Sequence, residues 1–339
     1  MTRSGMAHFG TADAAKSQFF ASMCQNKKLQ SRLGTDIFGV GVRRQDLGIE
    51  DRKEWTISVY LRSAEVVKEL DDEIPNRFGG VRVSPQVMGR SPRFAIGQGP
   101  CRGRIFDPIK PGCSISLKGS DRSGTLGCLV GNGESLYMVT AGHVLNPHFA
   151  QPDEDTTDVV QSSSEYKQDR SRTIAYVNRV TALQSTQLGD EPAQVNDIDI
   201  AVAEVTQDTK WNLHVHGIGR QISGAIAAET VGRSRVKKYG QSTGYSEGMV
   251  YDRNTIISIK EPGTNECYWF QNAIVFFPKS RERSEFFAKP GDSGAIAWNS
   301  QGKPLAMIIG VSDRSAVAIP WQRIQDELGM GLLEHIRAQ

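Results

Sequence analysis

Short apolar runs separated by turns dominate the chain from about residue 113 onward. Most are rich in Val and Ile and only a few residues long, which is typical of β-strands. Many strands at short spacing predict barrels or a sandwich, and they argue against strands that alternate with helices. The eleven segments that we expect to be strands are 113–118, 124–131, 135–141, 157–161, 173–180, 197–205, 248–259, 267–277, 294–298, 304–312 and 315–320.

The first hundred residues have a mixed pattern. Apolar positions at loosely helical spacing over residues 12–33 predict one or two short helices, and residues 63–75 predict another that Pro75 closes. No group of side chains in this compact α+β unit suggests chemistry of its own. The strands that we expect here are 36–44, 55–61 and 80–87.

Proline and glycine become frequent between residues 84 and 112, which is typical of a linker. We therefore place a domain boundary near residue 100. It divides the chain into an N-terminal α+β domain with its linker at residues 1–100 and a strand-rich domain at residues 101–339. The last apolar segment begins at Pro320, has helical spacing and predicts a closing amphipathic helix.

Composition narrows the classes of function. Of the 339 residues, 38% are hydrophobic and 23% charged, and the net charge is only +2 with both signs interspersed, so we expect no nucleic-acid partner. No window approaches the roughly 18 apolar residues of a membrane span, so we expect no membrane partner either. The five cysteines are odd in number, and none forms a C-x-x-C pair. Without a signal-peptide pattern as well, the sequence predicts a reduced, cytoplasmic protein with no metal site.

The stretch Gly-Asp-Ser-Gly at residues 291–294 raises the question of a nucleophilic serine. Alone, it fits a turn between two strands equally well. A serine hydroxyl becomes a good nucleophile when a neutral histidine accepts its proton and a carboxylate orients that histidine. Of the six histidines, only His143 ends an apolar strand in a turn, within YMVTAGHVL. His143 is therefore the candidate base.

Two carboxylates compete for the role of the acid. Asp197 and Asp199 lie on one face of the run VNDIDIAVAEV, which is otherwise apolar. A buried carboxylate costs several kcal/mol unless it is paired, so one of them should have a partner. Asp199 directly precedes Ile-Ala-Val and is preferred. Asp197 remains the alternative, with a strand-start cap or a surface charge as its other interpretation.

In this order, VTAGHV, DIAVAEV and KPGDSGAIAW resemble the three catalytic segments of the chymotrypsin-like (trypsin-fold) serine peptidases. The resemblance implies a mainly β protein with a double six-stranded β-barrel, preceded here by the small α+β domain and followed by the C-terminal helix. A looser resemblance begins near residue 36 and includes DIFGVGV, PGCSISL and VKKYGQSTGYSEGMV. This second resemblance is to bacterial intracellular trypsin-like peptidases, a branch that is similar to the narrow-leaf-type plant serine peptidases.

The resemblance implies a role for each matched residue. Ser293 would attack the peptide carbonyl, His143 would take and return the proton, and Asp199 would orient His143. The backbone amides of Gly291 and Ser293 would form the oxyanion hole. Glycine suits position 291 because the backbone turns sharply there.

The resemblance also implies two substrate-binding residues. Phe287, six positions before Ser293, would form the floor of the specificity pocket and favour apolar or small side chains. If KSRERSEFF is an insertion, a charge between residues 281 and 285 would enter the pocket instead. Gly310, within IIGVS, would lie on the strand that pairs with the substrate backbone.

Asp292 raises the question of activation. In secreted members of the family, a cut before an isoleucine creates an amine that pairs with the acid preceding the nucleophile. The corresponding acid here is Asp292, and Arg104–Ile105 is the bond that such a cut would break. The alternative is that Asp292 pairs with a local cation or with backbone amides while the linker stays whole.

The sequence thus predicts an intracellular serine endopeptidase that acts on protein or peptide substrates, needs no cofactor and is regulated by its N-terminal domain or by a protein partner. Two alternatives remain open. One is a catalytically silent trypsin-fold scaffold that binds peptides. The other is a peptidase that cuts once, in its own linker, and then stops.

Overall fold

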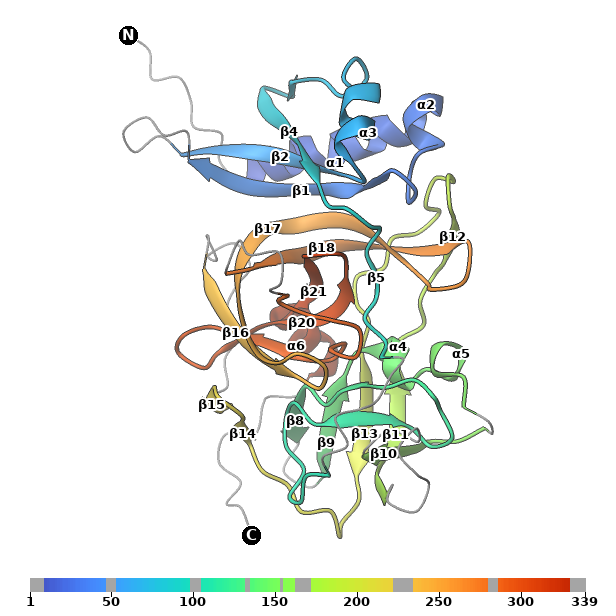
Figure 1. Cartoon of the computed structure of the whole chain (residues 1–339), viewed down its shortest axis with the longest axis vertical. Helices are drawn as coiled ribbons and strands as arrows, with labels where there is room; N and C mark the ends of the chain where they lie inside the picture. The colour runs from blue at the N-terminus through green and yellow to red at the C-terminus, as the bar shows by residue number, and fades with distance from the viewer. Residues whose placement is uncertain are drawn as a thin grey trace.

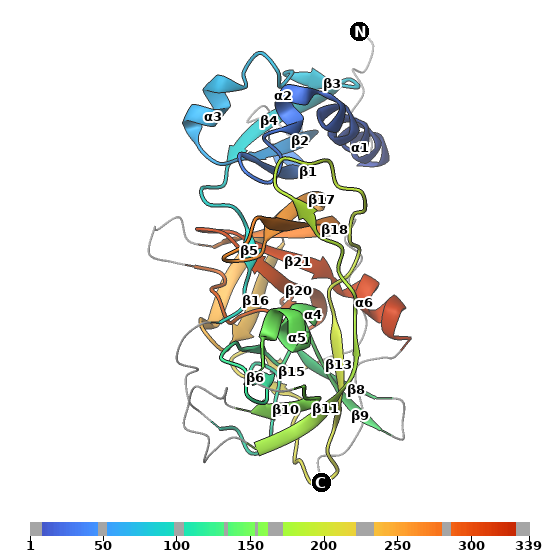
Figure 2. The same cartoon turned by 90° about the vertical axis from the view of Figure 1, so that its right-hand side faces the viewer.

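The computed structural model describes residues 9–46, 53–97, 105–131, 135–152, 155–161, 172–221, 234–279 and 286–329. Three tiers follow one another along the long axis (Figures 1 and 2): an α+β unit at one end, then the strands β16 to β21, then the strands β6 to β11 and β13. The protein is mainly β, in agreement with the sequence pattern.

The α+β unit consists of two packed layers. Three helices cover one face of a sheet in which β1 and β2 are antiparallel and β2 and β4 are parallel. Its elements are α1 (Phe9–Gln25), α2 (Lys27–Gln30), β1 (Ile37–Asp46), β2 (Lys53–Leu61), α3 (Ala64–Glu69), β3 (Arg77–Phe78) and β4 (Val81–Val87).

Helix α3 is shorter than the predicted helix over residues 63–75. It begins where the Ser63 hydroxyl accepts a hydrogen bond from the Val66 amide, and it ends at its C-cap, Leu70. Asp71 and Asp72 follow directly. Negative charges near a helix C-terminus oppose the helix dipole, which disfavours continuation of the helix through them.

Strand β1 joins the α+β unit to the barrel next to it, because it pairs antiparallel with β17 (Gly244–Lys260). At Gly39 the two backbones approach so closely that a Cβ would lie 2.1 Å from the Ile256 oxygen. The buried Lys16 of α1 also reaches β17, where its ammonium donates to the Asn254 carbonyl. The sheet is therefore continuous from the α+β unit into the barrel. The predicted domain boundary near residue 100 lies outside the described residues.

The tier farthest from the α+β unit is a six-stranded barrel. The sheet order is β7-β6-β10-β11-β13-β9-β8, and only two residues separate β7 from β8. The segment 124–131 therefore pairs with β6 at one end and with β9 at the other, which closes the ring. With β7 and β8 counted as one bent strand, its six strands are β6 (Ser114–Leu117), β7 (Gly124–Thr125) with β8 (Cys128–Gly131), β9 (Leu136–Thr140), β10 (Asp158–Gln161), β11 (Arg172–Val180) and β13 (Ala201–Val205).

The middle tier is a second six-stranded barrel. Its order is β18-β21-β20-β19-β16-β17, and an additional pairing of β17 with β18 closes it. The predicted double six-stranded barrel is therefore confirmed. In addition to β17, its strands are β16 (Arg235–Gly240), β18 (Glu266–Pro278), β19 (Ile296–Trp298), β20 (Pro304–Val311) and β21 (Ala316–Pro320).

The predicted C-terminal helix is α6 (Trp321–Leu328), which buries Trp321 and Ile324 in an apolar core shared by the two barrels. Among the described residues, no helix has both the length and the apolar character needed to cross a membrane. The remaining elements are short. They are α4 (Gly142–Leu145), α5 (Pro147–Ala150), β5 (Arg93–Phe94), β12 (Thr186–Gln187), β14 (His214–Val215) and β15 (Gly219–Arg220).

A carboxyl group is buried where the α+β unit meets the second barrel. Asp252 of β17 is 1% exposed, and its Oδ2 accepts a hydrogen bond of 2.6 Å from the Tyr60 hydroxyl of β2. Burial raises the pKa of Asp252, and the hydrogen bond from Tyr60 offsets part of that rise.

This raised pKa predicts a pH-dependent stability. In the unfolded chain an aspartate titrates near pH 4, so from there up to the folded pKa the folded state holds the extra proton. The free energy of unfolding should fall as pH rises through that window. Asp252→Asn, which keeps an oxygen for Tyr60, should therefore gain stability relative to the wild type as pH rises. Urea unfolding at several pH values measures this difference, and a difference that is constant with pH would contradict the assignment.

Candidate active site

Three side chains from distant parts of the sequence meet between the two barrels. His143 lies in α4, directly after β9, Asp199 lies two residues before β13, and Ser293 lies in the loop that leads into β19. The His143 Nδ1 is 2.6 Å from the Asp199 Oδ2, and the His143 Nε2 is 2.6 Å from the Ser293 Oγ. The sequence singled out all three, and they form one hydrogen-bonded line.

The carboxylate of Asp199 holds the histidine at two points. Its second oxygen, Oδ1, accepts a 3.0 Å hydrogen bond from the backbone N–H of His143. This contact requires glycine at position 142, because a Cβ there would lie 2.6 Å from the same oxygen. The ring position is thus fixed by the side chain and the backbone together. All three side chains of the line are fully buried.

The alternative acid, Asp197, does not reach His143. Its Oδ1 accepts hydrogen bonds from the side-chain amides of Gln271 and Asn272, at 2.8 and 3.2 Å, and its Oδ2 pairs with Arg323. Residues 197–200 precede β13, so the expectation that both aspartates lie on one face of a strand is wrong. Asp197 instead ties the loop before β13 to the second barrel and to α6.

Two backbone amides beside the serine point at one oxygen. The N–H groups of Gly291 and Ser293 donate to the carbonyl oxygen of Ala95, over 2.5 and 3.4 Å. Gly291 has a φ of 101°, and a Cβ there would lie 2.1 Å from the Ser242 Oγ. Only glycine fits this conformation and this space, so the donor pair depends on it.

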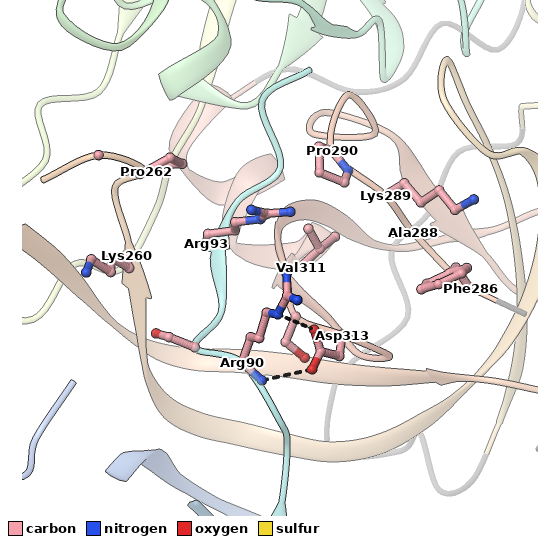
Figure 3. A pocket seen from close by; sticks show the side chains of 13 residues that line it. Arg90, Arg93, Lys260, Pro262, Phe286, Ala288, Lys289, Pro290, Val311 and Asp313 are labelled. Atoms are coloured by element: carbon pink, nitrogen blue, oxygen red, sulfur yellow. Dashed lines mark hydrogen bonds and ion pairs between the residues drawn. The ribbon is translucent and has the colours of Figure 1, made fainter. Parts of the chain in front are cut away.

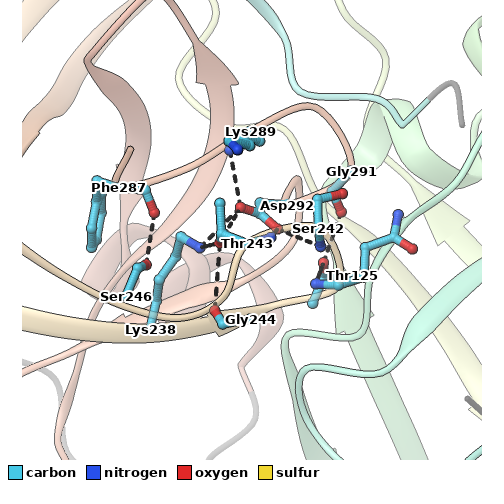
Figure 4. Close-up of polar contacts among 11 residues, drawn as sticks. Thr125, Lys238, Ser242, Thr243, Gly244, Ser246, Phe287, Lys289, Gly291 and Asp292 are labelled. Carbon is cyan, nitrogen blue, oxygen red and sulfur yellow. Dashed lines mark hydrogen bonds and ion pairs between the residues drawn. The ribbon is translucent and has the colours of Figure 1, made fainter. Parts of the chain in front are cut away.

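Asp292, between these two donors, is fully satisfied (Figure 4). The buried Lys238 ammonium and the Thr243 hydroxyl donate to its Oδ2 at 2.9 and 2.7 Å, and the Lys289 amide donates to the same oxygen at 3.0 Å. The Ser242 amide donates to its Oδ1 at 2.9 Å. The loop that carries Gly291 and Ser293 is therefore anchored to β16 and to the turn after it.

The lysine that pairs with Asp292 was not predicted from the sequence. Lys238 belongs to VKKYG, where two adjacent lysines suggest an exposed surface, yet its side chain is fully buried. Burial lowers the pKa of Lys238, and the Asp292 carboxylate opposes that shift. Asp292 thus pairs with a local cation and with backbone amides, the partners that the second interpretation of the sequence named for it. Arg104 lies outside the described residues.

The two substrate-binding candidates lie in different surroundings. Phe287 is fully buried in an apolar cluster of the second barrel, with its ring centre 5.3 Å from that of Phe276. Gly310 lies on β20 opposite Phe94 of β5. Residues 281–285, the alternative source of a pocket charge, lie outside the described residues.

A hollow of about 570 Å³ lies beside β5 (Figure 3). The arginine side chains at 90 and 93 reach it from the β5 segment, and Arg90 is held by an ion pair to Asp313. The hollow also receives Phe286 and Lys289 from the loop before Asp292. Val311 of β20 also lines it.

Known structures that resemble this chain include serine proteases. A glutamic-acid-specific serine protease is 20% identical, with a TM-score of 0.44 over 66% of this chain and 100% of its own. Protease A of Thermobifida fusca is 14% identical, with a TM-score of 0.43 over 67% and 99%. Deg5 is 15% identical, with a TM-score of 0.37 over 63% and 84%. No protein-family model matches the sequence, and no curated protein matches it significantly.

Proposed function

We propose that this chain is a serine endopeptidase that hydrolyses peptide bonds through an acyl-enzyme. One observation carries the proposal: the line Asp199–His143–Ser293 ends beside two amides that already hold a peptide carbonyl oxygen. A nucleophile, a base, an orienting acid and an oxyanion hole around one carbonyl are the parts that acyl transfer requires.

Each part has a step in the proposed mechanism. His143 accepts the proton of the Ser293 hydroxyl as the oxygen attacks the carbonyl carbon, and Asp199 stabilises the imidazolium that forms. The amides of Gly291 and Ser293 donate to the oxyanion of the tetrahedral intermediate. His143 then gives its proton to the leaving amine, and water repeats the sequence to release the acid. No metal or cofactor enters these steps.

The substrate in this proposal is a protein or peptide in extended conformation, with a small or apolar side chain before the bond. Phe287 supports that preference because its uncharged ring belongs to the apolar cluster that also contains Ala95. Other parts of the proposal are predictions from the sequence. They are the peptidase domain at residues 101–339, its regulation through residues 1–100 or a protein partner, the cytoplasmic location, and the resemblance to the bacterial intracellular and narrow-leaf-type branch.

A fluorophosphonate probe tests the nucleophile, because it phosphonylates an activated serine. We expect the probe on Ser293, and none on Ser293→Ala. Ala95 lies over Ser293, so the probe is also tested on the Ala95→Asp variant. This substitution places a charge in an apolar site and should displace the chain segment 93–97 from the serine. Arg93→Asp, at an exposed position of the same segment, is the matched control. Folded protein that stays unlabelled in both the wild type and Ala95→Asp would reject the proposal.

Gly291→Ala should lower the rate of peptide hydrolysis by about 10²–10³-fold, the usual cost of losing one oxyanion donor. The new Cβ would meet the Ser242 hydroxyl, and the positive φ disfavours alanine, so the Gly291 amide turns away. Gly80→Ala is the control, since Gly80 has a φ of 77° but open space around it. Both should lose a little stability, and only Gly291→Ala should lose activity. Equal rates in the two variants would argue against this oxyanion hole.

A further inference from the structure

A segment of the chain itself crosses the candidate active site. After β4, the chain descends along the second barrel to the level of α4 (Figure 1). There, β5 pairs antiparallel with β20, with Phe94 opposite Gly310 and Arg93 opposite Val311. The Ala95 amide then donates to the Ile309 carbonyl at 3.2 Å. Residues 93–95 thus add a strand to the edge that borders Ser293, which is the way an extended peptide binds a sheet edge.

The carbonyl of Ala95 is the one held by the two amides of the oxyanion hole. Its methyl group is fully buried in the apolar cluster that also contains Phe287 and Ala288. A peptide carbonyl in this position is where Ser293 would attack. The bond that follows it along the chain is Ala95–Ile96.

The residue before Ala95 is held by the histidine. The Phe94 ring is centred 4.4 Å from the His143 ring, and Phe149 and Tyr268 lie at 5.1 and 5.2 Å on its other sides. Phe94 is 1% exposed. The segment therefore fills a closed aromatic pocket and is not merely laid over the surface.

The residues after the bond are held as well. The Gly97 amide donates to the Ser123 carbonyl at 2.8 Å, and the Ser123 amide donates back to the Gly97 oxygen at 3.2 Å. A Cβ on Gly97 would lie 3.0 Å from the Gly291 Cα, so this position closely abuts the oxyanion loop. Ile96 between them is 7% exposed. The chain is thus gripped on both sides of Ala95–Ile96.

We propose that residues 93–97 are an internal substrate and that Ser293 cleaves the Ala95–Ile96 bond of its own chain; this inference rests on the proposed function. Ser293 Oγ would form an ester with the Ala95 carbonyl carbon, and His143 would pass the serine's proton to the Ile96 nitrogen as the C–N bond breaks. One water would then hydrolyse the ester. The products are a carboxylate at Ala95 and an amine at Ile96.

The geometry also assigns a sequence preference to the cleavage. In addition, it assigns to the uncut chain a state in which the candidate active site is covered. A small residue precedes the bond, an aromatic residue precedes that one, and glycine stands two positions after the bond. Before the cut, the segment covers His143, Asp199 and Ser293, which are all fully buried. The Ile96 amine is not required to pair with Asp292, because Lys238 already does so. Cleavage therefore only has to uncover the site, because the pairing of Asp292 that holds the loop of Ser293 is already formed before the cut.

Intact-mass measurement and N-terminal sequencing of the full-length chain test the inference. The wild type should yield two fragments, 1–95 and 96–339, and Ser293→Ala should stay whole. Ile96→Pro should also stay whole while remaining folded, because no hydrogen bond from the Ile96 amide is lost among the described residues, whereas the ring carbon on the nitrogen crowds the approach of His143, which must protonate that nitrogen. Arg82→Asp, at an exposed position of β4 outside this segment, should still cut itself. If cleavage is intramolecular, adding wild-type protein should leave Ser293→Ala uncut at this bond.

The outcomes separate this inference from the proposed function. A wild-type chain that takes up the fluorophosphonate probe on Ser293 but keeps Ala95–Ile96 whole overturns the self-cleavage alone. So does a wild type that is whole and unlabelled while folded Ala95→Asp is labelled, since the segment is then an uncut inhibitor. Folded wild type and Ala95→Asp that both lack label and cleavage overturn the proposed function itself.

Discussion

Asp199→Asn should lower the kcat of peptide hydrolysis by about 10⁴-fold, the loss that follows when the acid of such a triad becomes an amide. The Asn amide would present hydrogens to the His143 Nδ1, which is now 2.6 Å from a carboxylate oxygen. The ring would then carry its proton on Nε2, and it could not accept one from Ser293. Measured in the Ala95→Asp background, in which the internal segment does not compete with the peptide, the loss should therefore appear in kcat, with little change in KM.

Asp197→Asn is the matched control for this prediction. It lies two residues away, and its bonds to Gln271, Asn272 and Arg323 do not involve the histidine. We expect its kcat to stay close to the wild-type value. A large loss in Asp197→Asn with little loss in Asp199→Asn would exchange the two assignments and contradict the geometry of the site.

Lys238→Met should lower the free energy of unfolding by about 3–5 kcal/mol, the range found when one partner of a buried ion pair is removed. Asp292 would keep its hydrogen bonds from the Ser242 and Lys289 amides but lose its only buried counter-charge among the described residues. Activity should fall with stability, because Asp292 anchors the loop that carries Gly291 and Ser293. Urea unfolding measures the first effect and peptide hydrolysis the second.

The double variant Lys238→Met/Asp292→Asn is the control for charge. It removes both ions, so it should recover a large part of the lost stability. Lys237→Met, on the neighbouring position of β16, should have a small effect because that side chain is partly exposed. A Lys238→Met variant as stable as Lys237→Met would show that the pair does not hold the loop.

The triad was predictable because each of its members lies within a short, distinctive pattern. His143 and Ser293 end or begin apolar strands in glycine-containing turns, and Asp199 leads into a buried strand. The double barrel followed from many short apolar runs. These features are local, so they can be recognised without knowing which strands pair.

Two parts of the site left no such pattern. Lys238 alternates onto the inner face of β16, but a lysine is interpreted as exposed unless its partner, here 54 residues away, is known. The segment Arg93–Gly97 lies in a stretch rich in proline and glycine and was interpreted as linker. Its pairing with β20 joins positions more than 200 residues apart, and its fit depends on pockets that several distant elements build together.

Cleavage of an added peptide tests the central claim, that this chain is an endopeptidase, most directly. The peptide Ser-Pro-Arg-Phe-Ala-Ile-Gly copies residues 91–97, and the enzyme is the Ala95→Asp chain, in which the internal segment no longer competes. Mass spectrometry should find Ser-Pro-Arg-Phe-Ala and Ile-Gly, and neither product with Ala95→Asp/Ser293→Ala. A folded Ala95→Asp chain that cuts neither this peptide nor an unfolded protein such as casein would contradict the account.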